Sequence, residues 1–471
     1  MSIKMKKYRK KIIAGKTDIL NVEWATNRRD TNIVDPVLVS LEDRFGYAVK
    51  HTRIHYALFK LFWYRPKVLL LSNETGAREN YELCLFADKL GIITIVMISE
   101  GLHIVGRSLE EQKKIAKESM WGHNRKREVI WDLKLVWSNS FKNDVYQYVS
   151  NANKFKLKVS GGTGFDSYTL LSFDKNFSIL EHYKKDYKKI VLLIGYAFDL
   201  YPYYEEMDEE EKMWFYNQRF IVRDAYKKLI ENNPDILFIL KHHPGSINLD
   251  DTEFKDLDCM HYKNVIELHR EVDIRDLLNL SDIVIAYDST VCLEAWLMGK
   301  ITLLFNPLGE KFRRSSCYQG SPIAKKEEEL QFMLDEYYRK GSVTQFDNRS
   351  DDRKNVIEEE IQFSDGANYL RASKLINECI KANVRKRPSI NMEITIALIK
   401  ELLREIKSFL IEFTVLGFLN KGLRADLERS RLLYNTRERF EMIETYRMAI
   451  NKFESRNKEL VNDILLKYTG N

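Results

Sequence analysis

The sequence predicts an α/β protein with two domains, each built on a parallel β-sheet. Short apolar runs of strand length alternate with helix-length segments along most of the chain, and such alternation is typical of parallel sheets with right-handed crossovers. The pattern restarts after a charged link near residues 174–189. A chain of 471 residues is also too long for one ordinary core. We therefore expect Rossmann-like domains at 1–172 and 185–388, facing each other across a ligand cleft.

Strands and helices are predicted from the spacing of apolar residues, which is two in half-buried strands and 3.6 in amphipathic helices. In the first domain, strands are expected at 19–24, 47–51, 68–72, 92–99 and 133–138, and helices near 35–45, 55–63 and 78–90. In the second domain, strands are expected at 188–199, 236–241, 264–268, 283–287 and 301–305, and helices at 208–232, 275–280, 290–298, 325–340 and 365–382.

The segment 391–471 has a different pattern. Apolar residues recur at helical spacing through Leu465 without any proline, which predicts an appended helical tail. The run at 409–419 is strongly apolar and has basic residues around it, at Lys400, Arg404, Lys407, Lys421 and Arg424. Two alternatives stay open for this run: a helix that packs on the main body, or an interfacial helix that makes peripheral contact with a membrane.

Composition limits the classes of function. The net charge of +6 is modest for this length, so nucleic acid is not an expected partner. The 5 cysteines show no CxxC and no metal-ligand spacing, which favours reduced, buried thiols. The basic N-terminus lacks the apolar stretch of a signal peptide, and no run approaches the ~20 apolar residues of a membrane span. We expect a cytoplasmic protein, at the inner face of the cell membrane if the tail binds lipid.

Polar residues follow two predicted strands of the second domain. His243, Pro244 and Gly245 come directly after the strand at 236–241. Ser289 and Thr290 follow the strand at 283–287, where a helix begins. Ligands of open α/β sheets bind at such carboxyl ends, and hydroxyls with backbone N–H groups at a helix start suit a phosphate. A charged imidazole at His243 neutralises the charge of a leaving group, so His243 is also a catalytic candidate. The alternatives are a turn with a surface histidine and ordinary N-capping.

Two further residues of the second domain are candidates for nucleotide binding. Glu294 lies one helical turn after Thr290, on the same face, so its carboxylate is placed to hold ribose hydroxyls. Its alternative is a solvent-facing helix residue. Gly195 follows the strand that opens the domain and permits a close approach of the backbone to a ligand.

In the first domain, acidic and histidine side chains follow strand ends. Glu100 and His103 come after the strand at 92–99, and Gly101 permits a sharp turn between them. A carboxylate there is suited to take a proton from a sugar hydroxyl; the alternative is an ordinary turn. Glu74 lies in the segment 73–80, which has too few glycines for a dinucleotide fingerprint, so acceptor contact is its expected role. His103 is expected to contact the acceptor as well, and it is the alternative to Glu100 as the base.

The order of these motifs resembles the second domain of GT-B glycosyltransferases. The segments are KHHPG, NVIEL, IRDLL, SD, DST, EA and GK. They are most similar to bacterial surface-carbohydrate biosynthesis proteins, and more distantly to the Kdo, sialic-acid and glycerophosphate transferases that use cytidine nucleotides. The segment ISEGLH resembles the general-base motif of that family, and VSGGTGFDSY resembles its G-x-x-x-F-D element.

The resemblance implies roles for individual residues. Glu100 falls on the general base, His243 and Pro244 on the nucleotide-binding HP motif, and Ser289 and Thr290 on the phosphate motif. Two positions depart from the family pattern. Ser99 stands where a second acid is common, and Lys241-His242 stands where an arginine is common.

The expected function is transfer of a sugar from a nucleotide-activated donor, a CMP-sugar by preference, to a glycan or lipid-linked acceptor of a cell-envelope or capsular polysaccharide. The resemblance implies no cofactor and no metal, since helix dipoles and side chains stabilise the departing phosphate. Alternatives with the same fold are a polyol-phosphate transferase and a UDP-sugar 2-epimerase. A third is a non-catalytic nucleotide-binding subunit of a polysaccharide assembly complex.

Overall fold

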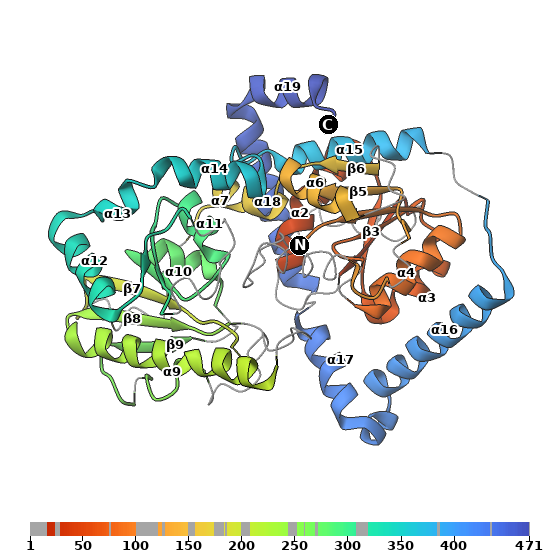
Figure 1. Ribbon diagram of the computed structural model, residues 1–471. Helices are drawn as coiled ribbons and strands as arrows, with labels where there is room; N and C mark the ends of the chain where they lie inside the picture. Colours follow the sequence, from red (N-terminus) through yellow and green to blue (C-terminus); the bar gives the residue numbers. More distant parts are fainter. Residues whose placement is uncertain are drawn as a thin grey trace. The chain divides into compact units, whose positions relative to one another are not determined.

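A computed structural model provides the structure (Figure 1). It describes residues 17–23, 29–74, 77–99, 121–124, 128–148, 156–173, 183, 186–198, 208–243, 252–258, 260–268, 272–307, 319–383, 387–433 and 436–470. The chain forms two compact units. Unit 1 comprises the described residues of Met1–Leu102, Lys114–Leu171 and Glu359–Asn471, and unit 2 those of Ser172–Glu358.

Unit 1 is built on a parallel six-stranded sheet with the strand order β2-β1-β3-β4-β5-β6. Its strands are β1 Ile19–Glu23, β2 Val49–Arg53, β3 Val68–Leu71, β4 Ile93–Met97, β5 Leu133–Val136 and β6 Leu157–Val159. The central strands are buried on both faces, as aliphatic runs such as VLLL and ITIVM require.

Helices cover both faces of this sheet and form two separate cores. One core joins the sheet to α3 Ala57–Tyr64, α4 Arg78–Lys89 and α16 Met392–Phe413. The other joins it to α2 Arg29–Asp43, α15 Asn368–Ala382, α18 Thr436–Arg456 and α19 Lys458–Lys467. The remaining helical elements of the unit are η1 Ile54–Tyr56, α6 Asn139–Tyr148, η3 Thr163–Asp166, α7 Ser167–Leu170, η9 Val415–Asn420 and α17 Lys421–Leu433.

The C-terminal segment is helical, as predicted, but it is part of unit 1. Leu398 of α16 lies in one core, and Tyr446 of α18 and Ile464 of α19 lie in the other. Residues from 359 onward also belong to unit 1, because α15 buries Tyr369 and Leu370 in its core. The compact units therefore differ at this end from the predicted domain 185–388 and the predicted tail 391–471.

Unit 2 contains a second parallel six-stranded sheet, ordered β12-β11-β10-β7-β8-β9. Its strands are β7 Lys189–Ile194, β8 Ile236–Lys241, β9 Val265–Leu268, β10 Ile283–Ala286, β11 Ile301–Phe305 and β12 Ile323–Ala324. Its helices are α9 Glu209–Asn232, α10 Ile274–Leu280, α11 Val291–Leu297, α12 Glu327–Lys340 and α13 Thr344–Asp347, followed by α14 Ser350–Ile361. The predicted α/β class with two Rossmann-like sheets is confirmed.

Candidate nucleotide site

Three parallel strands of unit 2 end side by side. β10, β7 and β8 are neighbours in the sheet, and their register pairs Ala286 with Ile194 and Ile194 with Lys241. The strands therefore end level with one another. Adjacent strands lie about 4.8 Å apart, so the residues that follow β10 and β8 are on the order of 10 Å apart, a span that a nucleotide can bridge.

Ser289 and Thr290 lie at the end of β10, as predicted. Ser289 is half-buried and its Oγ accepts the backbone N–H of Val291 at 3.2 Å, while Thr290 is exposed. The Ser289 carbonyl accepts from the N–H of Cys292 at 3.2 Å. Ser289 thus forms the turn that starts α11, a capping role that leaves the phosphate role a prediction. Glu294 is half-buried in the first turn of this helix.

Gly195 brings the end of β7 close to the end of β8. A Cβ atom at Gly195 would lie 3.1 Å from the His243 backbone nitrogen and 3.2 Å from Glu253 Oε1. Both distances are tighter than ordinary contacts, so a side chain would push these groups away. The close approach that the structure shows is therefore between parts of the protein, while an approach to a ligand stays a prediction.

Glu253 is a residue of this region that the sequence analysis missed. It is 1% exposed, and its Oε1 accepts the backbone N–H of Tyr196 at 2.5 Å. It thereby fixes the chain directly after β7. Its segment has neither strand nor helix periodicity, so no sequence signal distinguishes it from a surface acid.

The two adjacent histidines after β8 have different surroundings. His242 is buried, its Nε2 is hydrogen-bonded to the carboxylate of Glu267, and its ring meets the edge of Phe254 at 5.2 Å between centroids. His243 is half-buried. His243 is therefore the member of the pair whose side chain is accessible. Pro244 and Gly245 lie outside the described residues.

Other residues of the quoted motifs support the scaffold. The Asp273 carboxylate accepts the backbone N–H of Arg275 at 3.0 Å and caps α10. Lys300 Nζ donates to the carbonyls of Asn279 at 3.1 Å and Ser281 at 2.8 Å, at the other end of the helix. These contacts hold α10 and the start of β11 in place near β10.

In unit 1, Glu74 lies just beyond β3 and is buried. It forms an ion pair with Lys134 of β5, and both residues are at most 5% exposed. Its charge is thereby neutralised within the protein, and contact with an acceptor stays a prediction. Glu100 and His103 lie outside the described residues.

A charged cluster, largely buried, lies at the carboxyl end of β1 and beside the middle of β2, and the sequence analysis did not find it. It joins Glu23 of β1, His51 of β2, Asp35 of α2 and Arg439 of α18. Arg439 Nη2 donates to Asp35 Oδ1 at 2.6 Å, and Arg439 also pairs with Glu23. Burial raises the pKa of Asp35 to about 7, although the Arg439 charge opposes this, and burial lowers the pKa of His51.

The cluster also has the donor atoms of a metal site. Within the described part of the chain, Glu23, Asp35 and His51 are the group whose ligand atoms lie within 4.8 Å of one another. The Arg439 guanidinium already contacts both carboxylates, so it supplies the positive charge that a cation would bring. The residues therefore fit an internal ion-pair cluster better than a metal centre.

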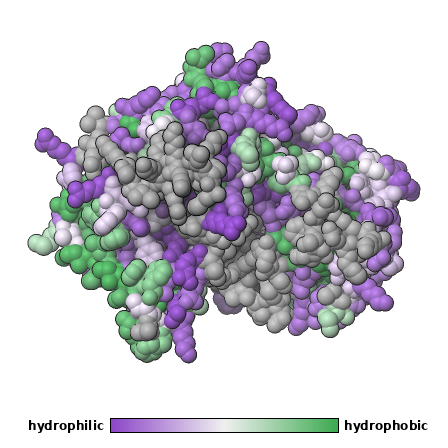
Figure 2. Space-filling view, turned by 180° about the vertical axis from the view of Figure 1, so that it is seen from behind, coloured by the Kyte–Doolittle hydropathy of each residue, from purple (hydrophilic) through white to green (hydrophobic). Residues whose placement is uncertain are grey.

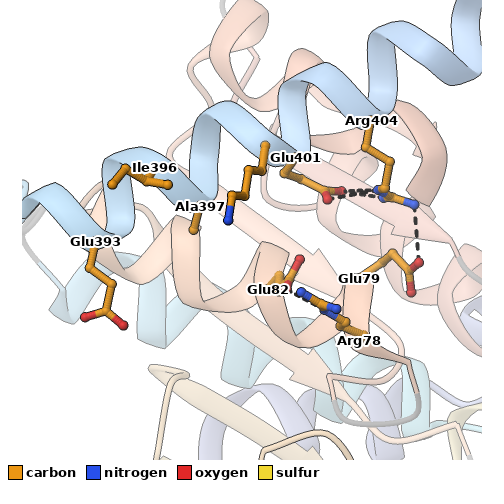
Figure 3. A pocket seen from close by; sticks show the side chains of 9 residues that line it. Arg78, Glu79, Glu82, Glu393, Ile396, Ala397, Glu401 and Arg404 are labelled. Atoms are coloured by element: carbon orange, nitrogen blue, oxygen red, sulfur yellow. Dashed lines mark hydrogen bonds and ion pairs between the residues drawn. The ribbon is translucent and has the colours of Figure 1, made fainter.

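A charged pocket lies between α4 and α16, close to the start of α4 (Figure 3). Its volume is about 460 Å³. Arg404 Nη1 is 3.2 Å from Glu79 Oε1, and Arg78 Nε is 2.7 Å from Glu82 Oε1. Both arginines are thus paired with carboxylates, whereas Lys400, which also lines the pocket, forms no ion pair with another described residue. The pocket adjoins the segment 73–80, for which acceptor contact was predicted.

Each unit contains a parallel six-stranded sheet flanked by helices, as in proteins of the GT-B fold. The sequence matches no family model and no curated protein. Similarity is found to solved structures.

A Listeria monocytogenes protein assigned as a UDP-N-acetylglucosamine 2-epimerase is 13% identical, with a TM-score of 0.53, over 80% of this chain and 100% of that chain. The S. aureus MnaA structure with UDP is 12% identical, with a TM-score of 0.53, and the match covers 80% of this chain and 100% of that chain. The wall teichoic acid polymerase TagF is 14% identical, with a TM-score of 0.50, and the match covers 79% of this chain and 90% of that chain. Identities this low establish a shared fold only.

Proposed function

We propose that this chain is a GT-B glycosyltransferase that moves a sugar from a nucleotide-activated donor to a glycan or lipid-linked acceptor. One observation carries the proposal: the level ends of β10, β7 and β8 gather Ser289, Thr290, Gly195 and His243 at one edge of the sheet. That edge is where ligands bind in open α/β sheets. Polar groups that donate hydrogen bonds there suit the phosphates of a nucleotide.

In the proposed reaction, the nucleotide lies at the ends of these strands. Ser289, Thr290 and His243 donate hydrogen bonds to its phosphate, and Glu294 holds ribose hydroxyls. Glu100 takes the proton of the acceptor hydroxyl, whose oxygen bonds to the anomeric carbon as the bond from that carbon to the phosphate oxygen breaks. The negative charge that develops on the departing phosphate is stabilised by donors already in place.

The donor and the absence of a metal are finer parts of the proposal. A CMP-sugar is the preferred donor because of the resemblance of the HP and DST segments to the cytidine-dependent transferases. A uridine nucleotide is the next to test, since the similar S. aureus structure contains UDP. We expect transfer to persist in EDTA, and activity that requires added magnesium or manganese would contradict this part.

A UDP-sugar 2-epimerase is the second candidate. The fold similarity to one such protein, from Listeria monocytogenes, extends over its full length, which favours it. The two activities differ in their need for an acceptor. Incubation with UDP-N-acetylglucosamine alone, followed by proton NMR, would show inversion at C2 for an epimerase and no such product for a transferase. A polyol-phosphate transferase remains a related alternative, because the TagF polymerase shares the fold.

A screen of CMP, CDP, UDP and GDP compounds by thermal unfolding tests the proposal most directly. A ligand at about a hundred times its dissociation constant adds about 2.7 kcal/mol to the free energy of unfolding. Stabilisation by one nucleotide class, followed by turnover of its sugar conjugate, would support the transferase. Binding without any turnover would favour the non-catalytic subunit, and the absence of stabilisation by every class would contradict nucleotide binding.

A further inference from the structure

Helix α16 of unit 1 exposes a row of large apolar side chains. The alternating spacing of four and three residues puts them on one face of the helix. Their exposed fractions run from 38% for Leu410 to 79% for Met392. The row, which we call the apolar stripe, consists of Met392, Ile396, Ile399, Leu403, Ile406, Leu410 and Phe413. At 1.5 Å per residue, it extends for about 30 Å.

The opposite face of α16 is fixed to the rest of unit 1. Glu405 accepts the backbone N–H groups of Leu58 and Phe59, both at 2.8 Å, at the start of α3. Glu412 accepts from Arg53 Nη2 at 3.1 Å and also from the Tyr56 hydroxyl. These buried contacts hold α16 against unit 1 by the face opposite the stripe. The stripe is therefore not the face by which the helix packs on unit 1.

Further apolar residues extend the exposed surface beyond the stripe. In η9, which follows α16 directly, Phe418 is 64% and Leu419 is 67% exposed. In α3, which α16 contacts, Trp63 is 71% and Phe59 is 49% exposed. Figure 2 shows hydrophobic residues gathered along the edge of the molecule formed by α16 and η9, at the lower left of that view. An apolar patch of this extent marks an interaction surface.

The exposed charges near the stripe that lack an ion-pair partner among the described residues are mainly positive, and Ile396 and Lys400 also line the pocket that contains Glu79 and Glu82 of α4. Lys400, Lys407 and Lys421 are exposed and form no ion pair with any other residue that the structure describes. The acids of α16 are mostly occupied: Glu405 and Glu412 are buried against unit 1, and Glu401 pairs with Arg404. Only Glu393, in the first turn, adds an exposed carboxylate to this helix.

The stripe also has the spacing of a coiled-coil seam, but its flanks do not suit a second copy. One flank carries Lys400 and Lys407, with Glu393 one heptad before Lys400, and the other carries Leu402 and Phe409. A parallel pair would place the lysines of one copy against the apolar flank of the other, without an opposite charge. An antiparallel pair would bring the two lysine-bearing flanks together. An anionic surface, by contrast, complements both the apolar face and the lysines.

We propose that the apolar stripe and its bordering lysines bind the surface of an anionic lipid membrane, with α16 lying in the plane of the interface. An amphipathic helix of this kind buries its apolar face at the boundary between headgroups and acyl chains, and basic residues add attraction to anionic lipids. No helix within the described residues is long and apolar enough to cross a membrane. The proposal does not depend on the transferase activity, because binding to lipid is measured without turnover.

Flotation of the full chain with lipid vesicles tests the proposal. Vesicles of phosphatidylcholine with phosphatidylglycerol should bind the protein more tightly than phosphatidylcholine alone. The double variant Ile399→Glu/Leu403→Glu should lose this binding, and Lys400→Gln and Lys407→Gln should each weaken it about fivefold. The matched control is Phe332→Glu, an exposed aromatic residue of α12 in unit 2 with 58% exposure, which should bind as the wild type does.

Unchanged vesicle binding by the stripe variant would overturn the proposal. The proposal would also be overturned if the wild type did not bind vesicles and instead formed a dimer, measured by light scattering, that the Ile399→Glu/Leu403→Glu variant did not form. The stripe would then be an interface between copies. Hydrogen exchange on the wild type gives a second measurement that needs no variant. Vesicles should slow exchange across 392–413, and bound protein without slowing there would contradict the assigned surface.

Discussion

Arg439 and Asp35 form a buried ion pair between residues 404 positions apart in the sequence. Their Nη2 and Oδ1 atoms are 2.6 Å apart, and their side chains are 9% and 0% exposed. The same guanidinium pairs with Glu23 at the end of β1. The two pairs therefore tie α18 to β1 and α2 of unit 1.

Arg439→Ala should destabilise the protein by about 3–5 kcal/mol, because it leaves two buried carboxylates without their counter-charge. Chemical denaturation followed by circular dichroism measures the loss. The control is Arg437→Ala on the same helix, whose side chain is 86% exposed and pairs with Glu441; it should change stability by less than about 1 kcal/mol. Equal losses of stability in the two variants would show that the buried pair stabilises the protein no more than the exposed one does.

Ser289→Ala combined with Thr290→Ala should weaken nucleotide binding by about 1.5–3 kcal/mol for each lost hydrogen bond to a charged phosphate. Calorimetry with the nucleotide found by thermal screening measures the change. Ser350→Ala, an exposed serine at the start of α14, is the matched control and should bind normally. A folded double variant with wild-type affinity would contradict the assignment of the phosphate site to the start of α11.

The two adjacent histidines should separate stability from activity. His243→Ala should lower turnover and leave the melting temperature nearly unchanged, because His243 is half-buried at the strand end. His242→Ala should lower the melting temperature, because it removes the buried partner of Glu267. Kinetics and thermal unfolding are measured on both, with the exposed His261→Ala as control. Normal kinetics for His243→Ala would exclude a role in catalysis.

Glu100→Gln should keep nucleotide affinity and reduce transfer by about 10²–10⁴-fold, since glutamine retains the shape but accepts no proton. Initial rates and calorimetry on the same preparation distinguish the two effects. Transfer within a few-fold of the wild type would show that Glu100 is not the base, and His103 and Glu74 would be the next residues to replace.

The contribution of Asp166 to the stability of the protein should fall as the pH rises from about 4 to 8. Burial raises the pKa of Asp166 to about 8, whereas an unfolded aspartate titrates near 3.9. Between these values the folded state keeps a proton that the unfolded state releases, so the free energy of unfolding decreases with pH. In Asp166→Asn, the free energy of unfolding should decrease less with pH than in the wild type. In Asp351→Asn, which changes an exposed residue, it should decrease as in the wild type. Identical slopes in denaturation at several pH values would contradict the shifted pKa.

The sequence by itself determined the two parallel sheets. The runs of β3, β4, β7, β8 and β10 are short, almost wholly aliphatic and bounded by polar residues, and a strand buried on both faces needs such a pattern. The predicted strands at these places are confirmed, with ends within a few residues. The three-residue β6 and the two-residue β12 were missed, because strands this short have no periodicity to detect.

The sequence also placed His243 and Ser289 at strand ends, but only the tertiary structure decided which neighbours they have. The register that levels β10, β7 and β8 and the burial of His242 with Glu267 depend on pairing between distant segments. The same holds for the C-terminal helices. Their amphipathic pattern predicted helix formation, while long-range contacts, including the Arg439 ion pairs, decided that they complete unit 1. The sequence left open whether the run 409–419 packs on the main body or lies at a membrane interface. In the structure, one face of α16 packs on unit 1 and the opposite face is exposed.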